Sequence, residues 1–244
     1  MNVPSERAAH PSVAAWAALR ATAGSRGAIV TLVRGDGGAS KAVGTHFALA
    51  DDGRTFGSVT IGGCANGRAV VSAERVLQSG VRERLTLPLG EEDARALGLG
   101  CAGDVDLLVE RVALTSPDPV ADALDAAEAA LEQGARVALV APLSGLAGRL
   151  FVREDGSSAG TTGGAARDDA ARALALHALG DAAAESGVYE AAGEEWLVQL
   201  LVSVRTVLVV GATDVAAALC ALAASLGWRI VLIDSRDGAL EEAS

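Results

Sequence analysis

The sequence predicts a mixed α/β fold in which a duplicated α+β unit is followed by a parallel β-α-β unit. Three observations lead to this prediction. Short apolar segments alternate with stretches of helical periodicity, glycine-marked hairpins recur along the chain, and an apolar strand, helix and strand close the sequence. Half of the 244 residues are apolar and only 3% are aromatic, so alanine and aliphatic side chains must build the core.

The first unit, residues 12–116, opens with a helix and ends at two X-Pro dipeptides. We expect, in order, a helix at 13–23, a strand at 28–33, a hairpin of 45–50 and 55–59, a helix at 65–78, and strands near 84–87 and 105–112. Asp51-Asp52-Gly53 has the residue types of a hairpin turn. Gly80 ends the second helix, and Ser116-Pro117 with Asp118-Pro119 marks the end of the unit.

The second unit, residues 118–203, repeats this order. We expect a helix at 120–133, a strand at 136–141, a hairpin of 149–152 and 159–161, a helix at 168–183 and a strand at 196–202. The offset is 103 residues in both the Gly53/Gly156 and the Gly57/Gly160 pair. This agreement predicts an internal duplication within a first domain of residues 1–203.

The last segment, residues 204–244, predicts the first β-α-β unit of an incomplete Rossmann-like domain. Apolar strands at 206–210 and 229–233 flank a helix at 214–226. Gly211 opens the first turn, Asp234 follows it at the spacing of a ribose-binding carboxylate, and Arg236 lies two residues further on. These three residues are the candidate nucleotide-binding residues. Thr213 and Asp214 in the turn disfavour a pyrophosphate, and two strands cannot bury both faces of a sheet. Either the sequence is part of a longer protein, or the unit packs on the preceding domain or on a partner chain.

Two glycine-flanked cysteines are the main candidates for chemistry. Cys64 ends Gly57-Ser58-Val59-Thr60-Ile61-Gly62-Gly63-Cys64 at the expected start of a helix, and Cys101 lies within Gly98-Leu99-Gly100-Cys101-Ala102-Gly103. Amides at a helix N-terminus bind anions and favour a thiolate. Cysteine is also a common small buried side chain, and this alternative stays open for both residues. We expect Cys220, inside an apolar helix, to belong to the core.

Composition excludes several classes of function. The formal net charge of −11 disfavours nucleic acid and anionic membranes as partners. We find no apolar run long enough to span a bilayer and no signal-peptide pattern near the N-terminus, so we expect a cytoplasmic protein. Three cysteines without a C-x-x-C spacing fit a reducing compartment, and the scattered histidines predict no metal site. Lys41, the only lysine, is a candidate phosphate contact, although a solvated loop lysine explains it equally well.

Three segments resemble the XdhC/CoxI family, the accessory factors of molybdenum hydroxylases such as xanthine dehydrogenase and carbon monoxide dehydrogenase. Residues 57–64 are similar to its G-S-x-x-G-G-C segment, residues 98–103 to its G-L-x-C-G-G segment, and residues 207–236 to its C-terminal Rossmann start ending in D-x-R. The resemblance implies a non-catalytic protein that carries the molybdenum cofactor, as molybdopterin or its cytosine dinucleotide form. It implies that the cofactor is protected during sulfuration and delivered to an apo-molybdoenzyme.

The resemblance also places the cofactor. By matching positions, the cofactor-binding residues are Gly62, Gly63, Cys64, Gly100, Cys101, Gly103 and Lys41. A cysteine desulfurase and a second copy of the chain are further expected partners. Two alternatives stay open: an NAD(P)-dependent oxidoreductase that uses the C-terminal β-α-β unit, and a truncated scaffold form without the family's activity.

Overall fold

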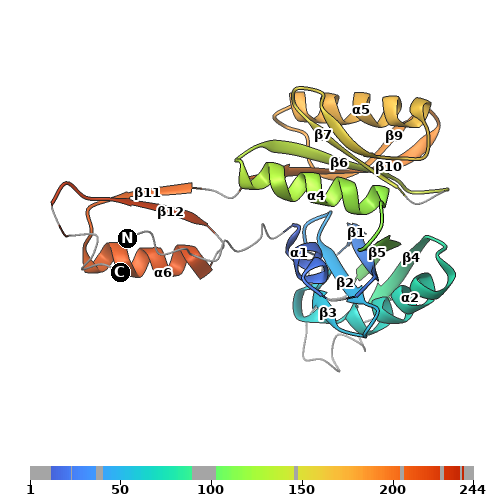
Figure 1. The fold of residues 1–244 in the computed structure, drawn as a ribbon, viewed down its shortest axis with the longest axis horizontal. Coiled ribbons are helices and arrows are strands. Elements are labelled where there is room, and N and C mark those ends of the chain that lie inside the picture. Colours follow the sequence, from blue (N-terminus) through green and yellow to red (C-terminus); the bar gives the residue numbers. More distant parts are fainter. Residues whose placement is uncertain are drawn as a thin grey trace.

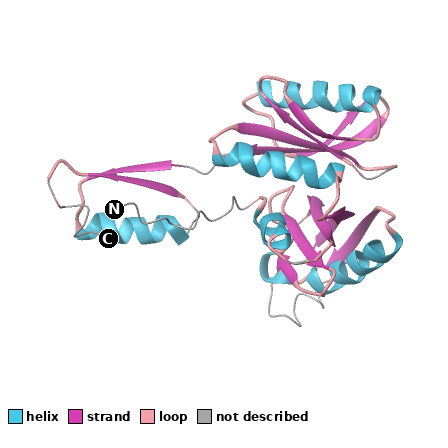
Figure 2. Cartoon of the chain, viewed as in Figure 1, coloured by secondary structure: helices cyan, strands magenta, loops and turns pink. Residues whose placement is uncertain are grey.

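The computed structural model describes residues 12–22, 24–36, 41–89, 103–145, 148–203, 206–225, 228–236 and 238. Two layered α/β bodies lie against one another, and a smaller unit of two strands and a helix extends from them (Figure 1). Both bodies and the smaller unit combine helices with strands (Figure 2), which confirms the mixed α/β class.

The first half contains one five-stranded antiparallel sheet of order β3-β2-β1-β5-β4. Its elements are α1 (Ala14–Arg20), β1 (Arg26–Gly35), β2 (His46–Ala50), β3 (Thr55–Gly57), the 3₁₀ helix η1 (Ile61–Gly63), α2 (Asn66–Ser79), β4 (Glu83–Leu89) and β5 (Gly103–Ala113). Helix α2 packs Ala69, Ala73 and Val76 on the outer face of this sheet. It ends at Gly80, whose φ of 69° is the left-handed conformation typical of a helix end.

The second half contains a sheet of the same form, β8-β7-β6-β10-β9. Its elements are α4 (Pro119–Glu132), β6 (Arg136–Pro142), β7 (Arg149–Arg153), β8 (Ser158–Thr161), α5 (Ala165–Gly180), β9 (Gly187–Ala191) and β10 (Glu194–Val202). Helix α5 covers the outer face with Ala171, Ala175 and Ala178. Helix α4 begins at Asp118, whose carboxylate accepts the N–H groups of Val120 and Ala121.

The inner faces of the two sheets meet in a shared core that also includes α1 and α4. Trp16 of α1 and Leu124 of α4 are buried there. The Trp16 Nε1–H donates to Asp125 at 2.8 Å, so the two helices also contact one another. The sheets are thus the middle layers, and α2 and α5 are the outer layers.

The third unit consists of β11 (Thr206–Val210), α6 (Asp214–Ser225) and β12 (Arg229–Ile233). Its strands pair in parallel, as the sequence predicts. The unit leaves apolar side chains exposed on both the strands and the helix: Leu208, Val210, Val215, Leu219, Leu222, Val231 and Ile233.

Most predicted elements are confirmed within a few residues, and two predictions need correction. Strand β9 was not predicted, because Gly187, Tyr189 and Glu190 leave little apolar pattern in this half-covered edge strand. Helix α5 covers residues 165–180 and not 168–183. It begins directly after Gly164, which is its N-cap residue. The domain boundaries at residues 203 and 204 stay a proposal. None of the helices in the described residues has the length and hydropathy of a membrane span.

Candidate functional site

The glycine-rich segment forms a tight turn that connects β3 to α2. After Gly57 the chain passes through η1 and reaches Cys64, two residues before the first residue of α2. The Ser58 hydroxyl donates to the Thr60 carbonyl at 2.7 Å, and the Thr60 hydroxyl accepts the Ala65 N–H at 3.2 Å. These hydrogen bonds hold the turn against the start of the helix.

Two glycines are required by this geometry. Gly57 has a φ of 74°, and a Cβ there would lie 2.7 Å from the His46 carbonyl oxygen. Gly63 also has a φ of 74°, a conformation that other residues adopt at a cost. The glycines of this motif therefore shape the backbone on which Cys64 is placed.

Cys64 is partly buried at the edge of the outer core of the first half. Its Sγ lies 4.0 Å from the Ile61 carbonyl oxygen, and the side chain packs beside the apolar cluster under α2. The first turn of α2 carries no acidic residue, and no side chain caps its N-terminus. A helix end of this kind favours an anion or a thiolate beside it.

Lys41 lies beside this turn. Its backbone N–H donates to the Val59 carbonyl at 3.5 Å, and its side chain is exposed. The loop that carries it is held from the second half, since Gln199 Nε2 donates to the Gly44 carbonyl at 2.9 Å. The backbone of Lys41 thus lies against the glycine-rich segment at Val59, and its role as a phosphate contact stays a prediction.

The second cysteine motif is described only at its end. Gly100 and Cys101 lie outside the described residues, and Gly103 begins β5, paired with Leu89 of β4. The guanidinium of Arg68, in the first turn of α2, donates to the Pro88 carbonyl at 2.6 Å. Leu89 and Gly103 therefore lie at the end of the sheet where α2 begins.

The corresponding turn of the second half is built differently. Asp168, in the first turn of α5, accepts the N–H and hydroxyl of Thr162 and the hydroxyl of Thr161, at 2.6 to 2.7 Å. Burial raises the pKa of Asp168, but these hydrogen bonds outweigh it and the pKa is lowered. The second helix start thus already holds a carboxylate, whereas the first is free of acidic residues.

A buried polar cluster between the two sheets was not predicted. Arg149 donates to Glu110 at 2.8 Å and to Gln199 at 2.7 Å, and its guanidinium also contacts Thr31 and His46. All five side chains are buried. Burial, followed by the charge of Arg149, lowers the pKa of His46 to about 3. Burial alone would raise the pKa of Glu110, but Arg149 and Arg82 lower it. The available signal was a charged residue inside an apolar strand, as in Leu107-Leu108-Val109-Glu110.

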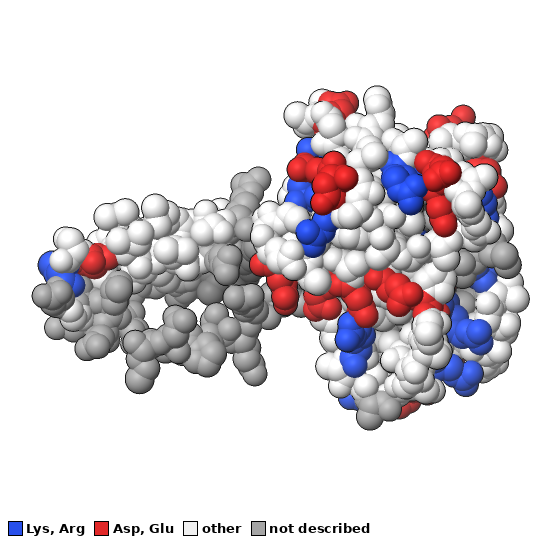
Figure 3. Space-filling model, turned by 45° about the horizontal axis from the view of Figure 1, so that its top comes forward, with Lys and Arg blue, Asp and Glu red and all other residues white. Residues whose placement is uncertain are grey.

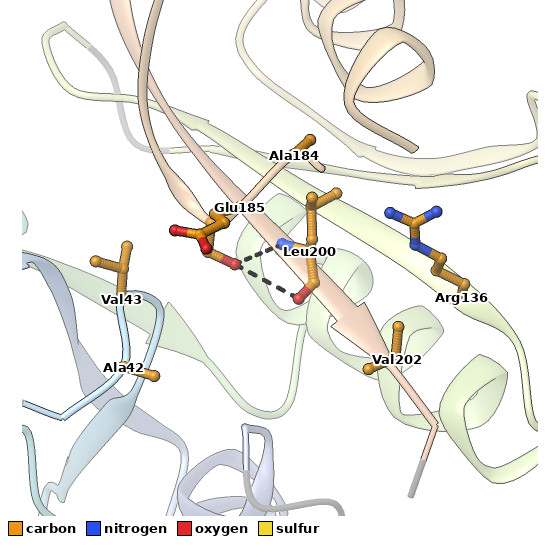
Figure 4. A pocket seen from close by; sticks show the side chains of 8 residues that line it. Ala42, Val43, Arg136, Ala184, Glu185, Leu200 and Val202 are labelled. Carbon is orange, nitrogen blue, oxygen red and sulfur yellow. Dashed lines mark hydrogen bonds between the residues drawn. The ribbon is translucent and has the colours of Figure 1, made fainter. Parts of the chain in front are cut away.

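A pocket of about 460 Å³ lies where β10 ends beside the Lys41 loop (Figure 4). Its walls are mostly apolar, with Val43, Leu200 and Val202, and Arg136 flanks it. The Arg136 guanidinium already donates to carbonyls at the end of α5, and Ser186 accepts the Leu200 N–H. The pocket therefore offers few polar groups that are not already hydrogen-bonded.

In the third unit the three candidate nucleotide-binding residues lie together. Asp234 accepts the Ala212 N–H at 2.6 Å, next to Gly211, and Arg236 binds the same carboxylate at 2.7 Å. Hydrogen bonds from Arg236 hold the pKa of Asp234 far below its usual range. The carboxylate that would bind a ribose thus closes its own turn in this structure.

Two further features concern the acidic side chains and the potential metal ligands of the described residues. Acidic side chains form a row across the middle of the face in Figure 3. Helix α4 contributes acidic residues three or four positions apart: Asp122, Asp125, Glu128 and Glu132. Among the described residues, no three His, Cys, Asp or Glu side chains are grouped as a metal site.

Comparisons with known proteins bear on the family and the fold. Residues 20–88 match the model of the XdhC and CoxI family, which confirms the resemblance at the first cysteine motif. A crystal structure described as a xanthine dehydrogenase from Bacillus halodurans is similar over 94% of this chain, with 19% identity and a TM-score of 0.72. The chain spans 64% of that structure's length, so the likeness concerns the fold. No curated protein matches the chain.

Proposed function

We propose, from the premise that residues 20–88 form a domain of the XdhC and CoxI family, that this chain serves the maturation of a molybdenum hydroxylase. It binds the molybdenum cofactor as cargo, protects it while it is sulfurated, and delivers it to an apo-enzyme of the xanthine dehydrogenase or carbon monoxide dehydrogenase type. It performs no turnover of its own, and it works in the cytoplasm with a cysteine desulfurase as a further partner and with a second copy of itself.

One observation carries this proposal: Cys64 is partly exposed beside an acid-free helix start, in a turn that contacts the Lys41 backbone at Val59. The cofactor carries a terminal phosphate or, in its dinucleotide form, an internal diphosphate, and either anion suits helix amides and a lysine. Its metal is already held by dithiolene sulfurs, and a thiolate is a further sulfur ligand that such a metal could accept. Gly62, Gly63 and Lys41 would bind the phosphate end, and Cys64 would lie near the metal end.

The second motif completes the site in this proposal. Leu89 and Gly103, the described residues on either side of residues 90–102, pair at the end of the sheet where Arg68 of α2 contacts Pro88. The family resemblance assigns Gly100 and Cys101 to the same cofactor site as Cys64. The second half supplies no equivalent site, because Asp168 occupies the corresponding helix start and repels an anion.

The test is anaerobic titration of the full chain with molybdenum cofactor, followed by molybdenum and pterin assays after desalting. We expect one equivalent to be retained by the wild type and by Cys220→Ala, the matched control in α6, and to be lost in Cys64→Ala and Cys101→Ala. Retention that is equal in all four proteins would reject the proposed site. No retention by the folded wild type would reject the carrier function for this chain.

The alternative is an NAD(P)-dependent oxidoreductase that uses Gly211, Asp234 and Arg236. The Asp234–Ala212 hydrogen bond disfavours it, because a ribose would have to displace this contact. Nucleotide binding that depends on Gly211 and not on Cys64 would favour this alternative. Binding of neither ligand would favour the truncated scaffold form.

A further inference from the structure

The two halves of the chain present equivalent residues to one another. Phe47 pairs with Gly57 across one hairpin, and Leu150 pairs with Gly160 across the other, so Phe47 corresponds to Leu150. The preceding residues, His46 and Arg149, correspond as well. The His46 carbonyl oxygen lies so close to Gly57 that a Cβ there would clash with it, and the Arg149 carbonyl oxygen lies against Gly160 in the same way.

The registers of the central strands give the second correspondence. Val30 pairs with Phe47 and Val109 in the first sheet, and Val140 pairs with Leu150 and Val198 in the second. Val109 therefore corresponds to Val198, and the next residues, Glu110 and Gln199, correspond to each other. These are the residues that meet in the buried polar cluster.

The apolar side chains between the two sheets also come in corresponding pairs. Both members of each corresponding pair lie in one shared cluster between the sheets: Val33 and Leu143, Leu108 and Leu197, Ile29 and Leu139, Ala48 and Phe151, and Val112 and Leu201. At the rim, the corresponding Asp106 and Glu195 both lie within 4 Å of Arg84.

We infer that the two halves are related by an approximate twofold axis that passes between His46 and Arg149. The Glu110–Arg149 ion pair occupies one of two equivalent positions across this axis, and the neutral His46–Gln199 pair occupies the other. Each inner face therefore fits the other half and does not fit a copy of itself.

The reason that neither half fits a copy of itself is electrostatic, and it differs between the two halves. If two second halves met about this axis, two Arg149 guanidiniums would be buried facing Gln199 residues, with no carboxylate from either half. A buried charge without a partner is strongly destabilising. If two first halves met, each Glu110 would lose the hydrogen bonds of Arg149 that it accepts at 2.7 and 2.8 Å. The ion pair thus acts as a recognition element between the halves.

The axis predicts that a second ion pair can be built at the other position. In the full chain, His46→Arg places a second guanidinium beside Arg149, and we expect the unfolding equilibrium constant to rise about a hundredfold or more. Adding Gln199→Glu supplies a carboxylate where Glu110 stands in the other half. We expect the double variant to recover most of the lost stability in urea unfolding.

The matched control is His46→Arg combined with Gln199→Met, which removes the same amide without adding a charge and should show no recovery. If His46→Arg alone does not fold, the double variant still decides, because a folded double variant supports the axis. The inference that the two positions across the axis are equivalent is overturned if the double variant is unfolded or no more stable than His46→Arg. It is also overturned by equal recovery with methionine.

Discussion

Gly57 provides a direct test of how the glycine-rich turn is built, through the substitution Gly57→Ala. The residue has a φ of 74°, and Gly53, in the preceding hairpin turn, has a φ of 86°. Left-handed backbone costs a residue with a Cβ roughly 1–2 kcal/mol at either position. A Cβ at Gly57 would also lie 2.7 Å from the His46 carbonyl and 3.0 Å from the Ala15 Cβ, whereas a Cβ at Gly53 would meet nothing within 4 Å.

The expected effects follow from these contacts. Overpacking against backbone adds about 1–3 kcal/mol, so Gly57→Ala should lower the free energy of unfolding by about 2–5 kcal/mol. Gly53→Ala should lower it by about 1–2 kcal/mol. Urea unfolding followed by far-UV circular dichroism measures both, and the m-values should match the wild type. Equal losses in the two variants would refute the close approach of β3 to β2.

Three further predictions concern the contacts between the halves. The pKa of His46 in the folded protein is about 3, below its ordinary value of 6.5. As the pH falls below 6.5, the unfolded chain therefore binds a proton that the folded protein does not bind. The free energy of unfolding then decreases by about 1.4 kcal/mol for each pH unit. His46→Gln should reduce the slope of stability against pH by about 1.4 kcal/mol per unit in urea unfolding between pH 6 and 5, whereas the same change at the exposed His177 should leave it. Asp118→Ala removes the cap of α4 and should cost about 1–2 kcal/mol in thermal unfolding; no loss would contradict the cap. Gln199→Leu removes hydrogen bonds to both the Gly44 carbonyl and Arg149, and hydrogen exchange of residues 41–45 should become up to about tenfold faster relative to that of α5.

The secondary structure was largely predictable because its signals are local. Residues that are neighbours in the sequence specify the hairpin turns with Asp-Gly, the helix that ends at Gly80 and the closing apolar strands. Strands β11 and β12 match the predicted ranges, and their parallel pairing follows from the helix between them. Strand β9 was missed because an edge strand with one solvated face keeps little apolar signal.

The candidate site was predictable only in part. Glycines flanking Cys64 indicate a turn, and the turn is present with the cysteine at its end. Its contacts with Lys41 depend on how the loop after β1 returns to the sheet, which no local pattern specifies. The buried cluster of Arg149 and Glu110 joins residues 39 positions apart, so the sequence offered two isolated charges and no reason to pair them.

The third unit has a consequence for how the protein unfolds. Val210 and Val215 are 77% and 78% exposed, and the unit extends away from the two sheets (Figure 1). Regions with few buried apolar contacts open at a lower free energy than a well-packed core. Residues 206–233 should therefore open and close as a separate cooperative unit, and proteases should cleave there while both sheets remain native. A preparation judged intact by its circular dichroism can have lost this unit, and only a mass measurement on the whole chain would reveal it.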